Sequence, residues 1–101
     1  MKVSFEQSGG LAGMMVSTTV DSGSLPKEEA SLLQNLVKDA NFFTLPSKSE
    51  PPRQGAADYF EYTISVENDG LKHTVETTDL TMPESLKPLI RYLRSKLQRK
   101  S

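Results

Sequence analysis

The chain has 101 residues, of which 36 % are hydrophobic and 25 % are charged, and its formal net charge is −1. These values are typical of a single globular domain, here residues 1–101, and predict no intrinsic disorder outside the ends of the chain. Cysteine is absent, which excludes disulfides, thiol catalysis and thiolate metal sites. No apolar run approaches the roughly 20 residues of a membrane span, and the first 30 residues lack the pattern of a secretory signal. We therefore expect a cytoplasmic protein that does not enter a membrane.

Charge is distributed unevenly along the chain. Residues 85–101 contain six Lys or Arg and no acidic residue, whereas residues 1–84 contain 13 acids against six bases, a net charge of −7. The basic stretch could bind phosphate or an anionic lipid. Cations also offset the partial negative charge of C-terminal helix carbonyls, and that structural interpretation is preferred.

The first half of the chain predicts two strands and a helix. Polar and apolar residues alternate over 2–7 and 14–21, which predicts strands, and 8–13 holds three glycines and reads as a hairpin loop. Pro26 suits a first helical position. Apolar residues spaced three and four apart predict a helix up to about residue 40, with one buried face formed by Leu33, Leu36, Val37 and Ala40. Asn41 and the two phenylalanines after it should end this helix.

An irregular stretch and a second hairpin follow. Residues 45–55 contain three prolines and a glycine without periodicity, a length at which a loop is usually functional or mobile. Alternation returns from residue 59 with Phe60, Tyr62, Ile64 and Val66 on one face. The sequence Asn-Asp-Gly at 68–70 predicts a tight turn into a strand over 71–77.

The last element is predicted to be a helix with a complicated start. Thr81 and Glu84 match a capping box. Pro88 cannot occupy a mid-helix position without loss of a hydrogen bond, so a short first turn should precede a main helix from about Leu86. The predicted buried stripe is Leu86, Leu89, Ile90, Leu93 and Leu97.

Together these elements predict an α+β fold with the order β-β-α-β-β-α. The sheet should be four-stranded and antiparallel, with the two helices packed on one face.

The sequence offers little catalytic chemistry. His73 is the only histidine, and its strand parity with Val75 favours a half-buried structural role. Glu61 and Glu76 are predicted on the solvent side of their strands, which favours a solvated face over a catalytic pair. We expect no enzyme activity, cofactor or metal site. The carboxylates on the strand faces also argue against nucleic-acid binding.

Several short motifs resemble those of a known family. They are Gly9-Gly10-Leu11-Ala12-Gly13 between two strands, Leu25-Pro26-x-Glu28-Glu29, Asn41-Phe42-Phe43-x-Leu45-Pro46, Asp58-Tyr59-Phe60-x-Tyr62 and the Asn-Asp-Gly hairpin. In this order, over essentially the whole chain, they resemble emfourin, a bacterial protein inhibitor of thermolysin-like zinc metallopeptidases such as protealysin.

The resemblance implies a reversible one-to-one complex with such a peptidase, formed by a protein that is monomeric when free. Thermolysin-like enzymes prefer a bulky apolar residue after the scissile bond. We therefore hypothesise that the segment Gly9, Gly10, Leu11, Ala12 and Gly13 enters the cleft extended, with Leu11 as the apolar anchor. A second candidate contact is the segment from Pro46 to Ala57. There Pro51 and Pro52 stiffen the chain and remove backbone donors, and both properties slow proteolysis.

Alternatives remain for both segments and for the function. The glycines could simply form a hairpin turn, and the proline-rich stretch could be a connector without a partner. The protein could also be a non-enzymatic interaction module, or a β-rich adaptor that pairs with a copy of itself through a sheet face or edge.

Overall fold

The computed structural model describes residues 1–9, 15–47 and 59–97. In these ranges the elements follow the order β1 (Lys2–Gly9), β2 (Val16–Asp21), α1 (Lys27–Asp39), β3 (Phe60–Asn68), β4 (Leu71–Thr78) and α2 (Lys87–Ser95). Short 3-10 turns lie at Ser22–Ser24, Phe42–Thr44 and Glu84–Leu86. The predicted order β-β-α-β-β-α is confirmed.

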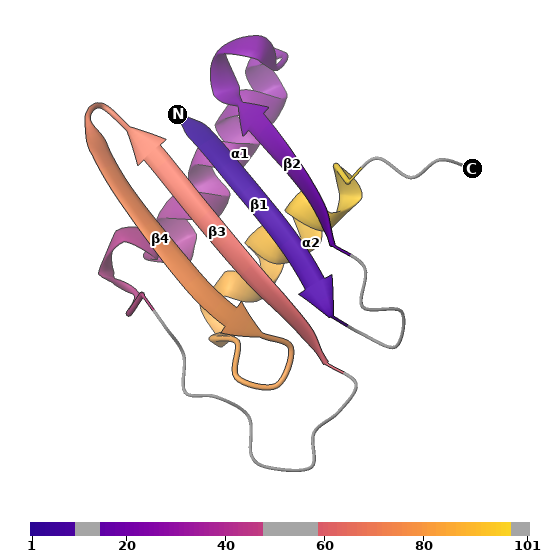
Figure 1. Cartoon of the computed structure of the whole chain (residues 1–101). Coiled ribbons are helices and arrows are strands. Elements are labelled where there is room, and N and C mark those ends of the chain that lie inside the picture. Colours follow the sequence, from indigo (N-terminus) through magenta and orange to yellow (C-terminus); the bar gives the residue numbers. More distant parts are fainter. Residues whose placement is uncertain (10–14, 48–58, 98–101) are drawn as a thin grey trace.

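The four strands form one antiparallel sheet in the spatial order β2-β1-β3-β4. Both helices lie on the same face of this sheet, as Figure 1 shows, and the other face is left uncovered by them. β1 and β3 occupy the middle of the sheet, so the N-terminal and C-terminal hairpins are joined by their inner strands. The predicted four-stranded antiparallel sheet with two helices on one face is therefore confirmed.

The alternation in the sequence places the apolar side of each strand against the helices. Phe5 and Tyr62, from the two middle strands, stack with ring centroids 5.8 Å apart. Leu33 of α1 and Leu93 of α2 are fully buried from the other side. The buried hydrophobic residues of the core are Val3, Phe5, Val20, Leu33, Val37, Ala40, Phe42, Tyr62, Ile64, Val66, Val75, Leu86, Leu89, Ile90 and Leu93.

The second hairpin turns as predicted. Asp69 and Gly70 connect β3 to β4, and their φ values of 51° and 82° are both positive. A two-residue turn with two positive φ values matches the right-handed twist of the flanking strands, and Asp-Gly tolerates it well.

Helix α1 begins one residue later than predicted, because Pro26 has an extended backbone and acts as its N-cap. Its end is as expected: Ala40 is the C-cap and Asn41 adopts a left-handed conformation with φ 52°, a usual way for a helix to stop. The second predicted strand is described from Val16, and Met14 lies outside the described residues.

The predicted capping box before the last helix is wrong. The Thr81 hydroxyl is hydrogen-bonded to the Thr78 hydroxyl at 2.9 Å, and Pro83 is the N-cap of the turn that leads into α2, without a side-chain cap. The turn Glu84–Leu86 and the place of Pro88 in the first turn of α2 are as predicted.

A polar cluster joins the two helices at the surface. The Tyr92 hydroxyl donates to Glu29 Oε2 at 2.7 Å, and the Lys96 ammonium forms an ion pair with the same carboxylate. Burial, then the hydrogen bond and charge of Glu29, raise the pKa of the Tyr92 phenol. The hydrogen bonds from Lys96 and Tyr92 lower the pKa of Glu29.

Candidate functional site

One end of the sheet carries the boundaries of both predicted binding segments, and we call it the loop end. β1 finishes there at Gly9 and β2 begins there at Val16, so residues 10–14 are bounded at this end (Figure 1). β3 also begins there at Phe60, the register partner of Gly9. The sheet order therefore brings the boundary of residues 48–58 beside that of residues 10–14.

Most of the predicted contact residues lie outside the described ranges. They are Gly10, Leu11, Ala12, Gly13, Pro51 and Pro52, and their roles stay predictions. Gly9 is described and has a structural reason to be glycine. Its φ is +98°, and a Cβ built there would lie 2.8 Å from the carbonyl oxygen of Tyr59. Its part in binding a peptidase also stays a prediction.

The far boundary of residues 48–58 is fixed against β4. The Ser47 carbonyl accepts the Glu76 N–H at 2.7 Å. Nearby, His73 Nε2 lies 2.7 Å from the Leu45 carbonyl oxygen, so this nitrogen is the donor. The imidazole is partly buried and meets the Phe42 ring edge-on at a centroid distance of 5.6 Å. His73 is therefore a structural residue, as its strand parity predicted.

Two reciprocal hydrogen bonds fix the start of β3. The Phe60 N–H donates to Asp79 Oδ1 at 3.0 Å, and the Asp79 N–H donates to the Phe60 carbonyl at 3.2 Å. The Arg94 guanidinium of α2 lies over the Phe60 ring, 5.9 Å from its centroid. Phe60, which follows soon after residues 48–58, is thus fixed by the turn after β4, which we call the β4 turn, and by helix α2.

Exposed apolar side chains flank the loop end. Met15, just before β2, is 64 % exposed, and Leu80, just after β4, is 59 % exposed. β2 and β4 are the two edge strands of the sheet. Met15 and Leu80 therefore lie on opposite sides of the strand ends Gly9 and Phe60. Apolar exposure at a loop-bearing surface is typical of a protein-binding region.

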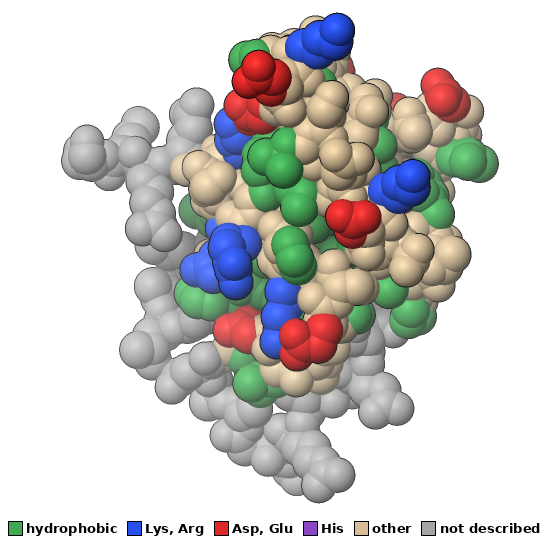
Figure 2. Space-filling view, turned by 180° about the vertical axis from the view of Figure 1, so that it is seen from behind, with side chains coloured by type: hydrophobic (Ala, Val, Ile, Leu, Met, Phe, Trp, Pro, Cys, Tyr) green, Lys and Arg blue, Asp and Glu red, His purple; other side chains and the backbone are tan. Residues whose placement is uncertain are grey.

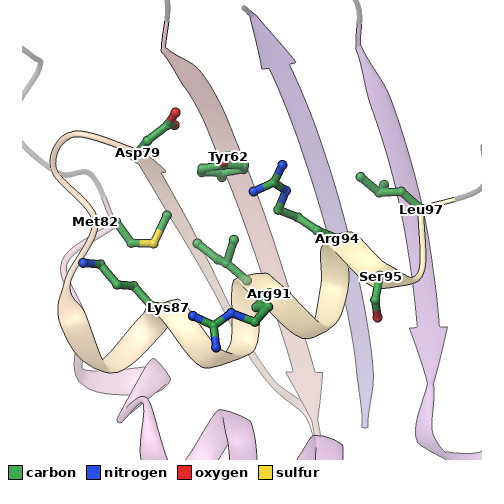
Figure 3. Close-up of a pocket in the computed structure, with 9 residues that line it drawn as sticks. Tyr62, Asp79, Met82, Lys87, Arg91, Arg94, Ser95 and Leu97 are labelled. Carbon is green, nitrogen blue, oxygen red and sulfur yellow. The ribbon is translucent and has the colours of Figure 1, made fainter.

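Beside the loop end, a cleft of about 590 Å³ lies between the β4 turn and α2; we call it the α2 cleft. Figure 3 shows the Tyr62 ring at its centre, with Asp79 and Met82 on the β4 side and Arg94 and Leu97 on the helix side. Burial raises the pKa of the Tyr62 phenol and the negative charge of Asp79 raises it further, whereas Arg94 lowers it.

The acidic residues predicted on the solvent face are placed as expected. Glu61 and Glu76 are both exposed on their strands. Asp79 and Arg94 were not singled out from the sequence, since neither belongs to a motif and their roles arise from contacts with Phe60.

Within residues 1–9, 15–47 and 59–97, no three His, Asp or Glu are grouped as metal ligands. No helix in these ranges is long and apolar enough to cross a membrane.

The comparisons with known proteins agree with the motif order. A family model described as Emfourin matches residues 5–94, nearly the whole chain. Searches of curated proteins and of solved structures gave no match.

Proposed function

The chain belongs to the Emfourin family, and on that premise we propose that it inhibits thermolysin-like, protealysin-type zinc metalloendopeptidases. Membership of this family indicates a protease-inhibitor role. The peptidase class, a reversible one-to-one complex and blockage of the active-site cleft are the proposed parts. We further propose that the free protein is a cytoplasmic monomer.

The observation that carries the mechanism is that the two predicted binding segments are both attached to the sheet at the loop end. The boundaries of residues 10–14 and the boundary of residues 48–58 at Tyr59 lie at neighbouring strand ends, with Gly9 in register with Phe60. One surface of the inhibitor can therefore present both segments to a single cleft. The exposed Met15 and Leu80 beside them add apolar area to that surface.

The rigid attachment of the segments favours binding. Phe60 is held by Asp79 and Arg94, and Gly9 is held by the central pair of strands. A binding segment whose ends are fixed loses less conformational entropy when it enters a cleft. In this proposal Leu11 fills the apolar pocket beside the peptidase zinc, and Gly10, Ala12 and Gly13 let the backbone approach the cleft walls.

The experiment is a titration of the purified protein into a fixed amount of a thermolysin-like peptidase. Trypsin and a papain-like protease serve as controls, and the mass of the intact inhibitor is measured afterwards. A sharp one-to-one endpoint with the metallopeptidase alone, and an uncut inhibitor, is the expected result. Undiminished peptidase activity together with digestion of the chain would contradict the proposal and favour the interaction-module alternative.

A shortened variant separates the two segments. If the segment with Pro51 and Pro52 contacts the peptidase, deletion of residues 48–54 should weaken inhibition. Full inhibition by the deletion variant would show that this segment makes no contribution. The oligomeric state of the free protein follows from its sedimentation velocity.

A further inference from the structure

The α2 cleft carries positive charge that the described residues do not compensate. Lys87, Arg91 and Arg94 lie four and then three residues apart along α2, so they share one face of the helix. Lys87 is paired with Glu84 at 2.8 Å. Over residues 1–9, 15–47 and 59–97, neither Arg91 nor Arg94 has a carboxylate oxygen within 4.0 Å.

The carboxylate that lines the cleft is already engaged. Asp79 Oδ1 accepts the backbone N–H of Phe60 at 3.0 Å, which orients the carboxylate toward the start of β3. The carboxylate keeps its negative charge, which also acts on Tyr62. It lies on the β4 side of the cleft (Figure 3) and forms no ion pair with either arginine among the described residues, so both guanidinium groups remain available to a ligand. The space-filling view from the helix side shows Lys and Arg side chains over α2, next to hydrophobic side chains (Figure 2).

Beneath this charge the cleft is apolar. Tyr62 and Ile90 are buried at its base, and the partly buried Met82 and Leu97 form its sides. The volume of about 590 Å³ lies within the range of roughly 300–1,000 Å³ that is usual for sites of small organic ligands. Met82 has an unbranched side chain that can adapt to the shape of an apolar chain.

We propose that the α2 cleft binds an organic carboxylate with an apolar chain, of the size of a medium-chain fatty acid. Arg94, whose guanidinium lies beside the Tyr62 ring in Figure 3, binds the carboxylate, and the apolar chain lies against Tyr62, Met82 and Leu97. Guanidinium groups suit this role because they donate paired hydrogen bonds to a carboxylate and remain charged at every physiological pH. The site does not depend on the proposed inhibition of a peptidase.

Decanoate is the probe, and binding to the full chain is measured by calorimetry and by amide chemical shifts. We expect saturable one-to-one binding, with shifts concentrated in α2 and in the turn after β4. Acetate has the charge without the chain, and decyltrimethylammonium has the chain with the opposite charge. Both should bind at least about tenfold more weakly than decanoate, a difference of roughly 1.4 kcal/mol each.

The variant Arg91→Gln/Arg94→Gln should lose about tenfold or more in decanoate affinity. Lys27→Gln is the matched control, because Lys27 is an exposed cation at the start of α1, away from the cleft, and it should bind like the unaltered protein. Circular dichroism checks that each variant is folded.

Three results would overturn the site: no decanoate binding at millimolar concentrations, equal binding of decyltrimethylammonium, or unchanged affinity of the double variant. Shifts centred on a different hollow, such as the one near Phe43 and Asn68, would also overturn it, and this readout needs no variant. Inhibition of the peptidase is assayed separately, so failure of one proposal is distinguishable from failure of the other.

Discussion

Phe60 and Asp79 bind each other through two hydrogen bonds, one to the Asp79 carboxylate at 3.0 Å and one between backbone groups at 3.2 Å. They join the first residue of β3 to the turn that follows β4. The pair therefore sets where the chain enters the sheet after residues 48–58, and it does so next to Gly9.

Replacement of Asp79 tests this pair. Asp79→Ala leaves the Phe60 N–H without its side-chain acceptor and should lower the free energy of unfolding by about 1 kcal/mol. Asp79→Asn keeps an oxygen at this position and should retain most of the stability. Urea unfolding of both variants measures the difference. Equal losses in the two variants would mean that the carboxylate charge, and not the hydrogen bond, is what matters.

Alanine substitutions at three glycines should give graded losses of stability. Gly23 has an ordinary φ and is exposed, and its new Cβ would lie 3.3 Å from Asp21 Oδ1. This oxygen is at the end of a side chain that can shift by a few tenths of an ångström, so Gly23→Ala should change the free energy of unfolding by less than about 0.5 kcal/mol. Gly70 has φ +82° and open space around it, so Gly70→Ala should cost about 1 kcal/mol from backbone strain alone. Gly9 combines φ +98° with a backbone oxygen 2.8 Å from the new Cβ, so its variant should lose the most. Thermal and urea unfolding give the order, and a Gly9→Ala variant as stable as Gly70→Ala would contradict the close approach.

The anchor hypothesis concerns Leu11. Leu11→Asp or Leu11→Ala should weaken inhibition of a thermolysin-like peptidase by at least about tenfold, or roughly 1.4 kcal/mol, because the apolar pocket is no longer filled. The thermal unfolding temperature should not change. Leu71→Ala is the matched control, since Leu71 is 65 % exposed at the opposite end of the sheet. Unaltered inhibition by the Leu11 variants would remove Leu11 from the binding surface.

The Glu29 cluster predicts acid sensitivity. Hydrogen bonds from Lys96 and Tyr92 lower the pKa of Glu29 below its usual value of 4.5. The ionised carboxylate therefore stabilises the fold above the unfolded pKa, and this contribution disappears as the pH falls through the lowered folded pKa. Glu29→Gln should be less stable than the unaltered protein at pH 7, and the difference should shrink below about pH 4.5. Glu28→Gln, at the exposed neighbouring position, is the control for the acid titration of urea midpoints.

The same cluster predicts alkaline sensitivity through Tyr92. Burial and Glu29 raise the pKa of the phenol, so the folded state keeps its proton when the unfolded chain has lost it. Stability is then complete below the unfolded pKa of about 10 and declines as the pH rises above it. Tyr92→Phe should be less stable than the unaltered protein at pH 8 and should show a shallower decline between pH 9.5 and 11. If stability declined equally in both proteins, the alkaline loss would come from titratable groups other than Tyr92.

The sequence was sufficient for features that depend on neighbouring residues. Alternation in Phe60, Tyr62 and Ile64 marked the buried side of β3, and Asp69-Gly70 marked the turn, because periodicity and positive φ are local requirements. The capping box failed although its pattern was complete. The Thr81 hydroxyl has a competing partner three residues earlier in Thr78, and Pro83 takes the N-cap position, so one local arrangement displaced another.

The candidate site could not be predicted in the same way. Its geometry depends on β1 pairing with β3, which brings Gly9 next to Phe60 across about 50 residues of sequence. Asp79 and Arg94 differ in no local pattern from the other acids and bases of the chain. Their contacts with Phe60 depend on how the turn after β4 and helix α2 pack against the start of β3, which no local pattern encodes.

The central position of β1 also has a consequence for the chain after a single backbone cleavage. A cut between residues 48 and 58 would give two fragments, each with one hairpin and one helix. Eight register pairs between β1 and β3, together with one shared core, would still join the fragments. Neither fragment could bury its apolar face alone. The cleaved protein should therefore behave as two complementing fragments, which migrate as one species under native conditions and separate only on unfolding.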